Sequence, residues 1–386
     1  MPLTSRERVL SAINHEEPDR VPTVIGASNA TGIKMAAYRS LKKMVGIQAE
    51  DRYLYDWPEL GTANPDESTL RRLKSDIRGI HDRLPASVIE KNKSRIAHSP
   101  FIDDWGGGQT EVEPGIWYPN LHPLSEAQSI EAIEQYPWPD MNDHSRVAHV
   151  SKIVKELAEE NQYAIMASPW LLFPLERAIA MQGMDKFLLN LVLHPDFSDA
   201  LLSKITELCR TLMGNFLKEV GDAIDIIKIG DDLGTQDRLL VSPQMYRKQI
   251  KPFHSDFIAF IKDHTKAKIF FHTDGDVFDL VDDFIEIGVD ILNPIQTSAG
   301  RMSNLAELKR RFGQNLCFCG GIDTQQTLPY GSVNDVRREV KRVIGLLGSG
   351  GGYMVAAVHT LMDNVPPKNI LAMVDAVEEF GNYPIN

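Results

Sequence analysis

Three residues near the ends of two apolar segments could bind a metal ion. His272 and Asp274 are two positions apart at the end of AKIFFHTDG, and His359 ends GGYMVAAVH. Residues two apart on a strand share a face, so His272 and Asp274 can point at one ion. Two imidazoles and a carboxylate form a donor set that zinc or another divalent metal accepts. The alternative is that residues 274–276 (DGD) form an ordinary turn with a helix N-cap.

A pair of adjacent carboxylates forms a second group of candidates. Asp231 and Asp232 end the apolar segment AIDIIKIGDD, and paired carboxylates can hold a proton, a cation or a basic group of a substrate. Helix capping is the alternative, but two adjacent aspartates rarely both serve as caps. Asp231, Asp232 and His359 are therefore the candidate catalytic residues. Four other residues follow apolar segments and are expected to contact substrate: Trp170, Gln236, Gln296 and Asp323.

The elements that must position these residues are short apolar segments separated by amphipathic helices, and six such segments follow residue 160. They are apolar on both faces, as in parallel sheets, and their alternation with helices predicts βαβ units. VPTVIG at 21–26 and one weakly marked strand in the first half bring the number of strands to eight. We predict an α/β fold with a single (β/α)8 TIM barrel; an open doubly wound sheet is the alternative. Barrel active sites lie at the C-terminal ends of the strands, where these polar residues fall.

The first 160 residues have a different character. Thr4 and Glu7 have capping-box spacing before an apolar stripe, which predicts an N-terminal helix. Stretches rich in Gly, Pro, Asn and Asp, such as FIDDWGGG and IWYPNLHPLSEA, are predicted to be loops. We expect residues 27–160 to contain lid-like insertions within one domain that spans residues 1–386. The aromatic residues of these loops either line a ring-accepting pocket or form local cores: Tyr53, Tyr55, Trp57, Trp105, Trp117, Tyr118 and Trp138.

The composition argues against several classes of protein. With 386 residues and a net charge of −12, the chain lacks the basic surface of a nucleic-acid binder and is unsuited to anionic membrane surfaces. No apolar run approaches the ~18 residues of a membrane-spanning helix, and the N-terminal segment does not resemble a signal peptide. Three cysteines are too few for a disulfide scaffold, so we expect a cytoplasmic protein in which Cys317 and Cys319 are core residues.

Motifs along nearly the whole chain resemble the uroporphyrinogen decarboxylase superfamily, which includes cobalamin-dependent methyltransferases. They are SRERVLSAINHEEPDRVP, YPWPD, SPWLLFPLERA, GDDLGTQ, FHTDGD, GGIDTQ and GGGYMVAAVHTLMDNVPPKNILAMVDA. The resemblance implies a (β/α)8 barrel with its site at the C-terminal face, and His359 resembles the active-site histidine of the decarboxylases. Those enzymes carry an early Arg-Gln-Ala-Gly-Arg segment that grips the carboxylates of the substrate. The stretch here is ASNATGIKMAAYRS, and a substrate with eight carboxylates needs a positively charged pocket, so we disfavour a porphyrinogen.

The resemblance to thiol-methylating members is also partial. Those members bind zinc through a His-x-Cys motif and a further cysteine, and here His272-Thr-Asp274 and His359 take these places. Histidine and carboxylate ligands make a harder, more Lewis-acidic centre, which resembles the members that demethylate small substrates such as aryl methyl ethers. The resemblance implies a methyltransferase with zinc or another divalent metal. The methyl group would pass to cobalamin presented by a separate corrinoid protein.

Two alternatives stay open. One is a decarboxylase that acts on a porphyrinogen or a smaller carboxylic acid, with an aspartate and His359 in acid–base roles. The other is a non-catalytic barrel that binds a ligand or a corrinoid protein. A homodimer is also compatible with the sequence.

Overall fold

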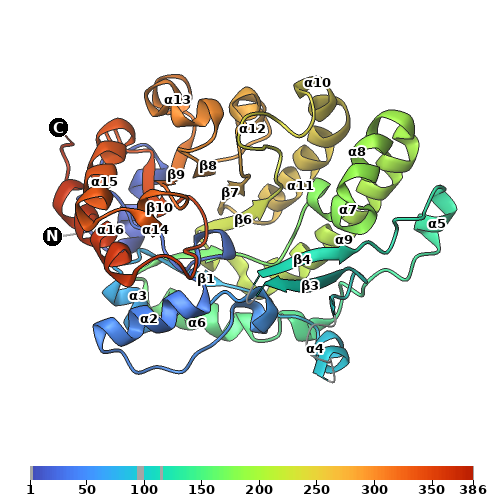
Figure 1. The fold of residues 1–386 in the computed structure, drawn as a ribbon, viewed down its shortest axis with the longest axis horizontal. Coiled ribbons are helices and arrows are strands. Elements are labelled where there is room, and N and C mark those ends of the chain that lie inside the picture. Colours follow the sequence, from blue (N-terminus) through green and yellow to red (C-terminus); the bar gives the residue numbers. More distant parts are fainter. Residues whose placement is uncertain (1–2, 94–99, 114–115, 386) are drawn as a thin grey trace.

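The main strands form a curled sheet in which all neighbours run parallel. The computed structural model describes residues 3–93, 100–113 and 116–385. Its seven-stranded sheet has the order β1-β5-β6-β7-β8-β9-β10 (Figure 1). The strands are β1 (Ile77–Ile80), β5 (Ala164–Ala167), β6 (Ile226–Gly230), β7 (Lys268–His272), β8 (Ile291–Ile295), β9 (Cys317–Ile322) and β10 (Tyr353–Ala357). Strands β5 to β10 coincide with the six predicted apolar segments, and β1 is the weakly marked strand.

Residues of the VPTVIG segment close this sheet into a barrel. Thr23 forms a parallel bridge with Val355 of β10, and the backbone N–H of Val24 donates to the Val355 carbonyl at 2.9 Å. On the other side, the N–H of Asp76, which precedes β1, donates to the Thr23 carbonyl at 2.9 Å. Because the segment pairs with both β10 and β1, it takes the eighth position in the ring. The predicted α/β TIM barrel is confirmed, and the doubly wound alternative is wrong.

The barrel interior is a packed apolar core. Alternate strand residues point inward, among them Ile226, Phe270 and the free thiols of Cys317 and Cys319. Helix α1 (Ser5–Ile13) adds three apolar side chains to this cluster and has the predicted capping box. The two cysteines are therefore core residues, as predicted.

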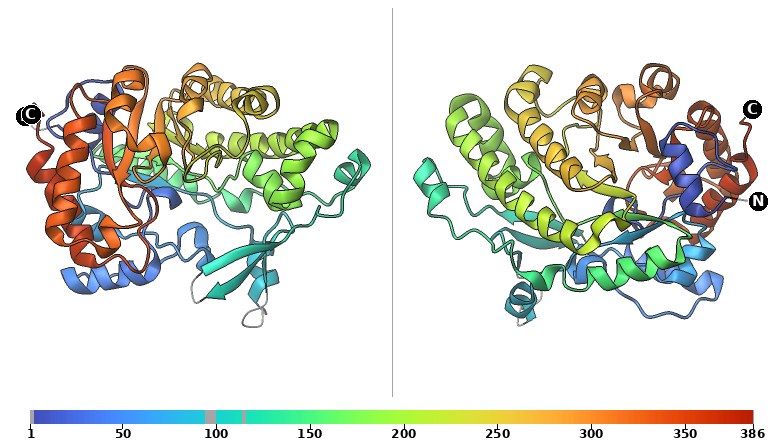
Figure 2. Two further views of the ribbon diagram at one scale, coloured as in Figure 1. Left: turned by 45° about the horizontal axis from the view of Figure 1, so that its top comes forward. Right: turned by 180° about the vertical axis from the view of Figure 1, so that it is seen from behind.

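Helices surround the barrel (Figures 1 and 2). Outward-facing strand residues such as Ile227, Phe271 and Phe318 belong to a second, larger apolar core. The remaining helices are α2 (Met35–Val45), α3 (Glu67–Arg72), α4 (Ala86–Lys93), α5 (Ile130–Glu134), α6 (Val150–Glu160), α7 (Leu175–Gln182), α8 (Met184–Leu193), α9 (Pro195–Val220), α10 (Pro243–Met245), α11 (Lys251–His264), α12 (Val281–Glu286), α13 (Leu305–Phe312), α14 (Thr327–Tyr330), α15 (Val333–Leu347) and α16 (Pro367–Phe380). Within the described ranges, no helix is long and apolar enough to cross a lipid bilayer.

The first half contains a small antiparallel sheet where loops were predicted. It consists of β2 (Phe101–Ile102), β3 (Gly108–Glu113) and β4 (Ile116–Leu121), so the prediction of loops is wrong there. In β4, Pro119 pairs with Gln109 of β3, and a proline cannot donate to the ladder. Backbone pairing rather than apolar burial defines these strands, so they lack the continuous apolar run that marks the barrel strands.

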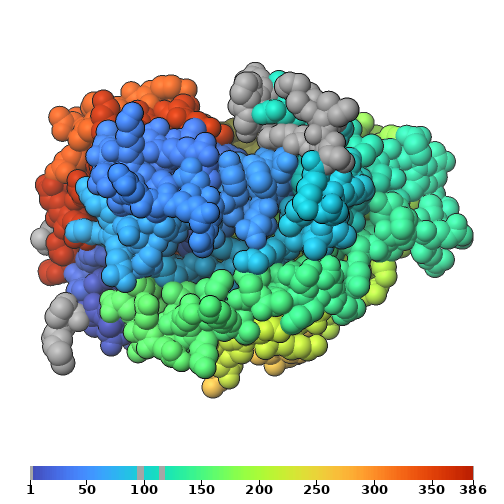
Figure 3. Space-filling view, turned by 90° about the horizontal axis from the view of Figure 1, so that it is seen from below, coloured from blue at the N-terminus to red at the C-terminus, as the bar shows by residue number. Residues whose placement is uncertain are grey.

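Much of the chain before residue 160 gathers on one side of the molecule. Figure 3 shows this face, where the segments coloured blue to green cover most of the visible surface. The β3–β4 hairpin lies on the same side as α2 and projects from the body of the protein (Figure 2). A lid-like role for residues 27–160, within one domain, stays a prediction.

Candidate active site

His272, Asp274 and His359 meet at the C-terminal end of the barrel. His272 is the last residue of β7, Asp274 follows two residues later, and His359 lies two residues beyond β10. One ligand atom from each residue lies within 4.8 Å of the other two. Asp274 Oδ2 is 4.0 Å from His272 Nε2 and 3.8 Å from His359 Nε2. The structure therefore brings together the three predicted metal ligands from two distant parts of the chain.

Asn293 of β8 fixes the orientation of His272. The two residues are register partners, and His272 Nδ1 lies 2.7 Å from Asn293 Oδ1. An amide oxygen only accepts, so Nδ1 carries the proton and Nε2 keeps its lone pair. Asn293 Nδ2 donates to the carbonyl of Cys319 at 3.3 Å, which holds the amide in this orientation. Burial lowers the pKa of His272 to about 4, so its ring is neutral near pH 7 and suited to bind a metal.

Two carboxylates in the loop after β7 have different surroundings. Asp276 accepts hydrogen bonds from the N–H groups of Phe278 and Arg301, so this residue stabilises the turn. Asp274 Oδ1, in contrast, is buried and has no hydrogen-bond partner among the described residues. Burial raises the pKa of Asp274 to about 6, and the charge of Asp232 adds to this rise. The turn alternative therefore applies to Asp276 and leaves the Asp274 carboxylate available.

Gly275 places Asp274 through a close contact with the loop after β6. The φ angle of Gly275 is +89°, and a Cβ atom at this position would lie 2.4 Å from the carbonyl carbon of Gly234. The N–H of Asp274 donates to Asp232 Oδ1 at 2.9 Å, and the N–H of Gly275 donates to Gln296 Oε1 at 2.7 Å. These contacts tie the loops after β6, β7 and β8 to one another, so the backbone of Asp274 is held from both sides.

The three side chains fit a divalent metal ion. Two neutral imidazole nitrogens and a carboxylate oxygen are zinc ligands, and catalytic zinc sites use three protein ligands with a fourth position open. A cation would also satisfy the buried Asp274 oxygen, whose burial without a partner is unfavourable. Metal binding itself stays a prediction.

Asp231 and Asp323 act as helix caps in the structure. The Asp231 carboxylate accepts the N–H groups of Leu175 and Glu176 at the start of α7, at 3.0 and 2.7 Å, and lies 2.9 Å from His254 Nε2. The Asp323 carboxylate accepts three N–H groups at the start of α14. These bonds occupy most acceptor positions of both carboxylates. The catalytic role of Asp231 and the substrate contact of Asp323 stay predictions.

Asp232, Gln236 and Gln296 lie beside the three predicted metal ligands. Gln296 Nε2 is 3.4 Å from Gln236 Oε1, and Gln296 also holds the loop that carries Asp274. Asp232 lines a neighbouring pocket as well. The catalytic role predicted for Asp232 and the substrate contacts predicted for Gln236 and Gln296 stay predictions.

A mostly apolar pocket of about 230 Å³ opens beside Asp232. Trp57 and Trp170 form an edge-to-face pair in its wall with ring centroids 5.4 Å apart, and Tyr55 packs edge-on against Trp170 at 5.2 Å. A cavity of about 150 Å³ holds one benzene molecule, so this pocket suits a single substituted ring. Other apolar lining residues are Pro119, Leu121, Leu172, Ile179, Met184 and Leu240, and the charged ones are Asp103, Glu176, Arg177 and Asp232.

Several aromatic residues of the first half pack into apolar clusters, and Trp57 among them also lines this pocket. Tyr55 and Trp57 are buried in a small apolar cluster with Leu84 and Phe101, and Trp57 also lines the pocket. Trp105 and Trp138 form a separate edge-to-face pair with centroids 6.1 Å apart. These four residues therefore form apolar clusters, as one interpretation predicts, and acceptance of a substrate ring by the pocket stays a prediction. The side chain of Trp117 lies outside the described part of the structure.

Two charged residues that were not predicted lie near Asp232, which lines the pocket. Lys228 of β6 is two positions from the inward-facing Ile226, so it points into the barrel. Burial lowers the pKa of Lys228, opposed by the charges of Glu176, Asp232 and Asp274. Burial raises the pKa of Glu176 well above its usual range, and Asp232 adds to this rise. A lone lysine at an inward register of IIKIG is a signal that could have identified Lys228; Glu176 carries no comparable signal.

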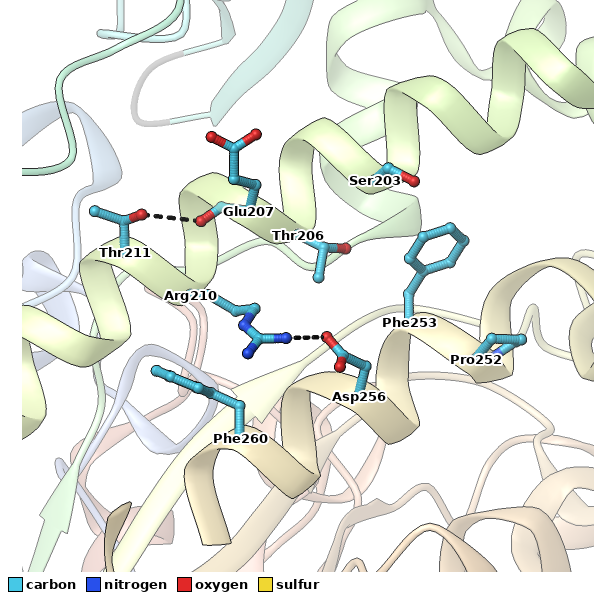
Figure 4. A pocket seen from close by; sticks show the side chains of 9 residues that line it. All are labelled: Ser203, Thr206, Glu207, Arg210, Thr211, Pro252, Phe253, Asp256 and Phe260. Atoms are coloured by element: carbon cyan, nitrogen blue, oxygen red, sulfur yellow. Dashed lines mark hydrogen bonds and ion pairs between the residues drawn. The ribbon is translucent and has the colours of Figure 1, made fainter. Parts of the chain in front are cut away.

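A second hollow, of about 660 Å³, lies between the outer helices α9 and α11 (Figure 4). Arg210 of α9 pairs with Asp256 of α11 at 2.5 Å and lies over the ring of Phe260. This groove contains none of the residues at the strand ends, so we do not assign the active site to it.

Comparisons with known proteins agree on one family. The family model described as uroporphyrinogen decarboxylase (URO-D) matches residues 110–380. A uroporphyrinogen decarboxylase of Geobacter sulfurreducens is 26% identical over 193 residues, 48% of this chain and 50% of that protein. One of Legionella pneumophila is 32% identical over 78 residues, 20% of this chain and 22% of that protein. One of Christiangramia forsetii is 24% identical over 282 residues, 70% of this chain and 75% of that protein. The match to the first two relatives thus spans half of their length or less.

The fold also has a solved counterpart. A methyltransferase from Methanosarcina mazei superposes with a TM-score of 0.65 at 18% sequence identity. The match covers 98% of this chain and 99% of that protein. At this level of identity the likeness establishes the barrel architecture.

Proposed function

The chain belongs to the uroporphyrinogen decarboxylase family, and we propose that it transfers a methyl group from a small methylated substrate to a corrinoid protein. One observation carries this proposal. Three residues suited to a divalent metal ion lie next to a mostly apolar pocket of the size of a single substituted ring. Both lie at the C-terminal end of the strands, where barrel enzymes place their active sites.

His272, Asp274 and His359 would hold the metal, and zinc suits this donor set. When bound, the ion supplies Lewis acidity, which polarises the ether oxygen and stabilises the charge that develops as the methyl group leaves. Asn293 keeps the ring of His272 in place, and the bond to Asp232 keeps the backbone of Asp274 in place. The residues of the chain therefore contribute a fixed set of ligands beside the substrate pocket.

The lining of the pocket favours an uncharged, ring-shaped methyl donor such as an aryl methyl ether. Trp57 and Trp170 present aromatic surfaces on which a substrate ring can pack. Among the described residues that line the pocket, Arg177 is the one lysine or arginine, and it already pairs with Asp103 at 3.2 Å. A substrate that carries several carboxylates would therefore find no unpaired cation among the described lining residues and would be repelled by Asp232.

The proposed methyl acceptor is cobalamin presented by a separate corrinoid protein. The side chains of Asp274 and His359 are 33% and 35% exposed. Because these predicted ligands reach the surface of the barrel mouth, a partner protein could approach the methyl group from solvent.

The names of the curated relatives favour a second candidate function, which is decarboxylation of a porphyrinogen or a smaller carboxylic acid. In that reaction, His359 and an aspartate would carry the acid–base steps. The size of the pocket and its acidic groups weigh against a tetrapyrrole with eight carboxylates. Conversion of uroporphyrinogen to coproporphyrinogen by the purified protein would favour this candidate.

The direct test is methyl transfer. Purified protein is incubated with cob(I)alamin, free or on a corrinoid protein, and with methylated aromatics such as 1,2-dimethoxybenzene. We expect the absorption spectrum of methylcobalamin to appear. If no donor yields methylcobalamin and no acid is decarboxylated, the non-catalytic alternative gains weight.

Elemental analysis tests the metal site independently of activity. We expect about one zinc or other divalent ion per chain, lost in His272→Ala, Asp274→Asn and His359→Ala. Asp276→Asn is the matched control, because this neighbouring carboxylate bonds only to backbone N–H groups among the contacts described. Metal retained in all three ligand variants would contradict the proposed site.

A further inference from the structure

The mechanism above leaves one feature of the pocket unused, which is the carboxyl group of Glu176. Glu176 stands in the first turn of α7, where its backbone N–H is held by Asp231 at 2.7 Å, and its side chain lines the pocket together with Asp232. Asp232 is also bonded to the backbone of Asp274. Glu176 therefore lines the same pocket as Asp232, and Asp232 in turn accepts the backbone N–H of a predicted metal ligand.

We propose that Glu176 is the proton donor to the oxygen atom from which the methyl group leaves. This inference rests on the proposed methyl transfer and adds a catalytic residue to it. When the methyl–oxygen bond breaks, its electron pair stays on the oxygen. The electron pair of the new cobalt–carbon bond comes from the Co(I) corrinoid, which becomes Co(III). The oxygen takes the proton of Glu176, and the substrate leaves as a neutral alcohol or phenol. Glu176 regains a proton from solvent through the pocket.

The surroundings of Glu176 favour the protonated form of its carboxyl group. Burial in a mostly apolar wall opposes ionisation, and the carboxylates of Asp231 and Asp232 oppose it further. Lys228 acts in the opposite direction and favours ionisation. The other charged or titratable groups of the pocket are Arg177 and Asp103, which pair with each other, and His122, whose Nδ1 lies 2.9 Å from the carbonyl of Ala180. None of these groups is a predicted metal ligand.

The apolar lining of the pocket explains why protonation of the product would be needed. A phenolate or alkoxide is poorly solvated among Trp57, Trp170 and Leu172, so its release as an anion is unfavourable. A proton delivered by Glu176 from the pocket wall converts the product into a neutral molecule, which can leave. General acids of this kind contribute about 10²- to 10⁴-fold to rates.

The first test measures single-turnover methyl transfer from 1,2-dimethoxybenzene to cob(I)alamin as a function of pH. We expect Glu176→Gln to lower the rate constant about 100-fold or more with little change in KM. The wild-type rate should fall as pH rises through the pKa of the acid, and this alkaline limb should be absent in Glu176→Gln. Glu176→Asp should restore part of the rate and the limb. Glu156→Gln on α6, where the side chain is 65% exposed, is the matched control and should behave as wild type.

The second test does not require activity. Infrared difference spectra of wild type minus Glu176→Gln at pH 7 should contain the carbonyl stretch of a protonated carboxylic acid, with a shift in D₂O. Absence of this band overturns the inference, as does a Glu176→Gln variant with the wild-type rate and pH profile. If the wild-type protein transfers no methyl group, the proposed function itself fails and the inference falls with it. If Glu176→Gln does not fold, the rate and pH profile of Glu176→Asp decide the inference in the same way.

Discussion

His272 Nδ1 and Asn293 Oδ1 lie 2.7 Å apart on neighbouring strands, in direct register across β7 and β8. This single contact sets which ring nitrogen of His272 faces the other predicted ligands. Hydrogen bonds of this kind to the second nitrogen of a ligand histidine are usual in metal sites, and their loss weakens metal binding about 10- to 100-fold.

We therefore expect Asn293→Leu to weaken zinc binding by a factor in that range while the fold is retained. Zinc titration of chelator-treated protein by calorimetry measures the effect. Asn315→Leu, at an exposed position, is the control. Equal zinc affinity in wild type and Asn293→Leu would show that Asn293 does not orient the ligand.

Gly275→Ala should strain the backbone of the loop after β7 and so displace Asp274 from the predicted metal site. The new Cβ would meet the loop of Gly234 at 2.4 Å, and the φ of +89° disfavours any side chain. Strain of this kind costs about 1–3 kcal/mol in the free energy of unfolding, and we also expect metal content to fall because Asp274 shifts. Gly46→Ala separates the two causes, since Gly46 has a similar φ of +73° with no atom within 4 Å of its added Cβ. If both variants lose equal stability and retain metal, the contact with Gly234 does not position Asp274.

Trp170→Leu should weaken binding of an aromatic methyl donor. The substitution removes the edge-to-face contacts with Trp57 and Tyr55, and one aromatic pair is worth about 0.5–1.5 kcal/mol. We expect a dissociation constant for 1,2-dimethoxybenzene about 2- to 10-fold higher, measured by calorimetry. Trp138→Leu alters the separate Trp105 cluster and should leave this constant unchanged. An equal loss of affinity in both variants would show that the ring of the methyl donor does not pack against Trp170.

The lowered pKa of buried His81 should reduce the stability of the folded protein at acidic pH. Burial lowers the pKa of His81 to about 4, from 6.5 for an ordinary histidine. As pH falls below about 6.5, the unfolded chain binds a proton that the folded chain does not bind until about pH 4, so stability is lost in this window. At pH 5 this effect lowers the free energy of unfolding by about 2 kcal/mol, because one pKa unit corresponds to 1.36 kcal/mol.

The change in unfolding free energy between pH 7.5 and pH 5 should therefore be about 2 kcal/mol smaller in His81→Gln than in wild type. Chemical denaturation at the two pH values measures it. His144→Gln removes a histidine whose side chain is 67% exposed and should keep the wild-type difference. An unchanged difference in His81→Gln would contradict a depressed pKa.

The local pattern of apolar segments in the sequence was enough to predict most strands of the barrel. The six apolar segments became β5 to β10 because a strand buried on both faces needs apolar residues throughout, whatever its partners are. The small sheet of β2 to β4 was missed for the complementary reason. Its strands are held together by backbone pairing. Backbone pairing does not require particular side chains, so the sequence gives little sign of it.

The sequence by itself determined the barrel, the placement of polar residues at the strand ends, and the three residues that could bind a metal. Only the tertiary structure decided which carboxylates are engaged by backbone donors. Asp231 and Asp323 cap helices, whereas Asp274 Oδ1 is left without a partner among the described residues. The reason is physical. A carboxylate binds whichever N–H groups the fold brings within about 3 Å, and sequence spacing does not specify those groups when they come from distant elements.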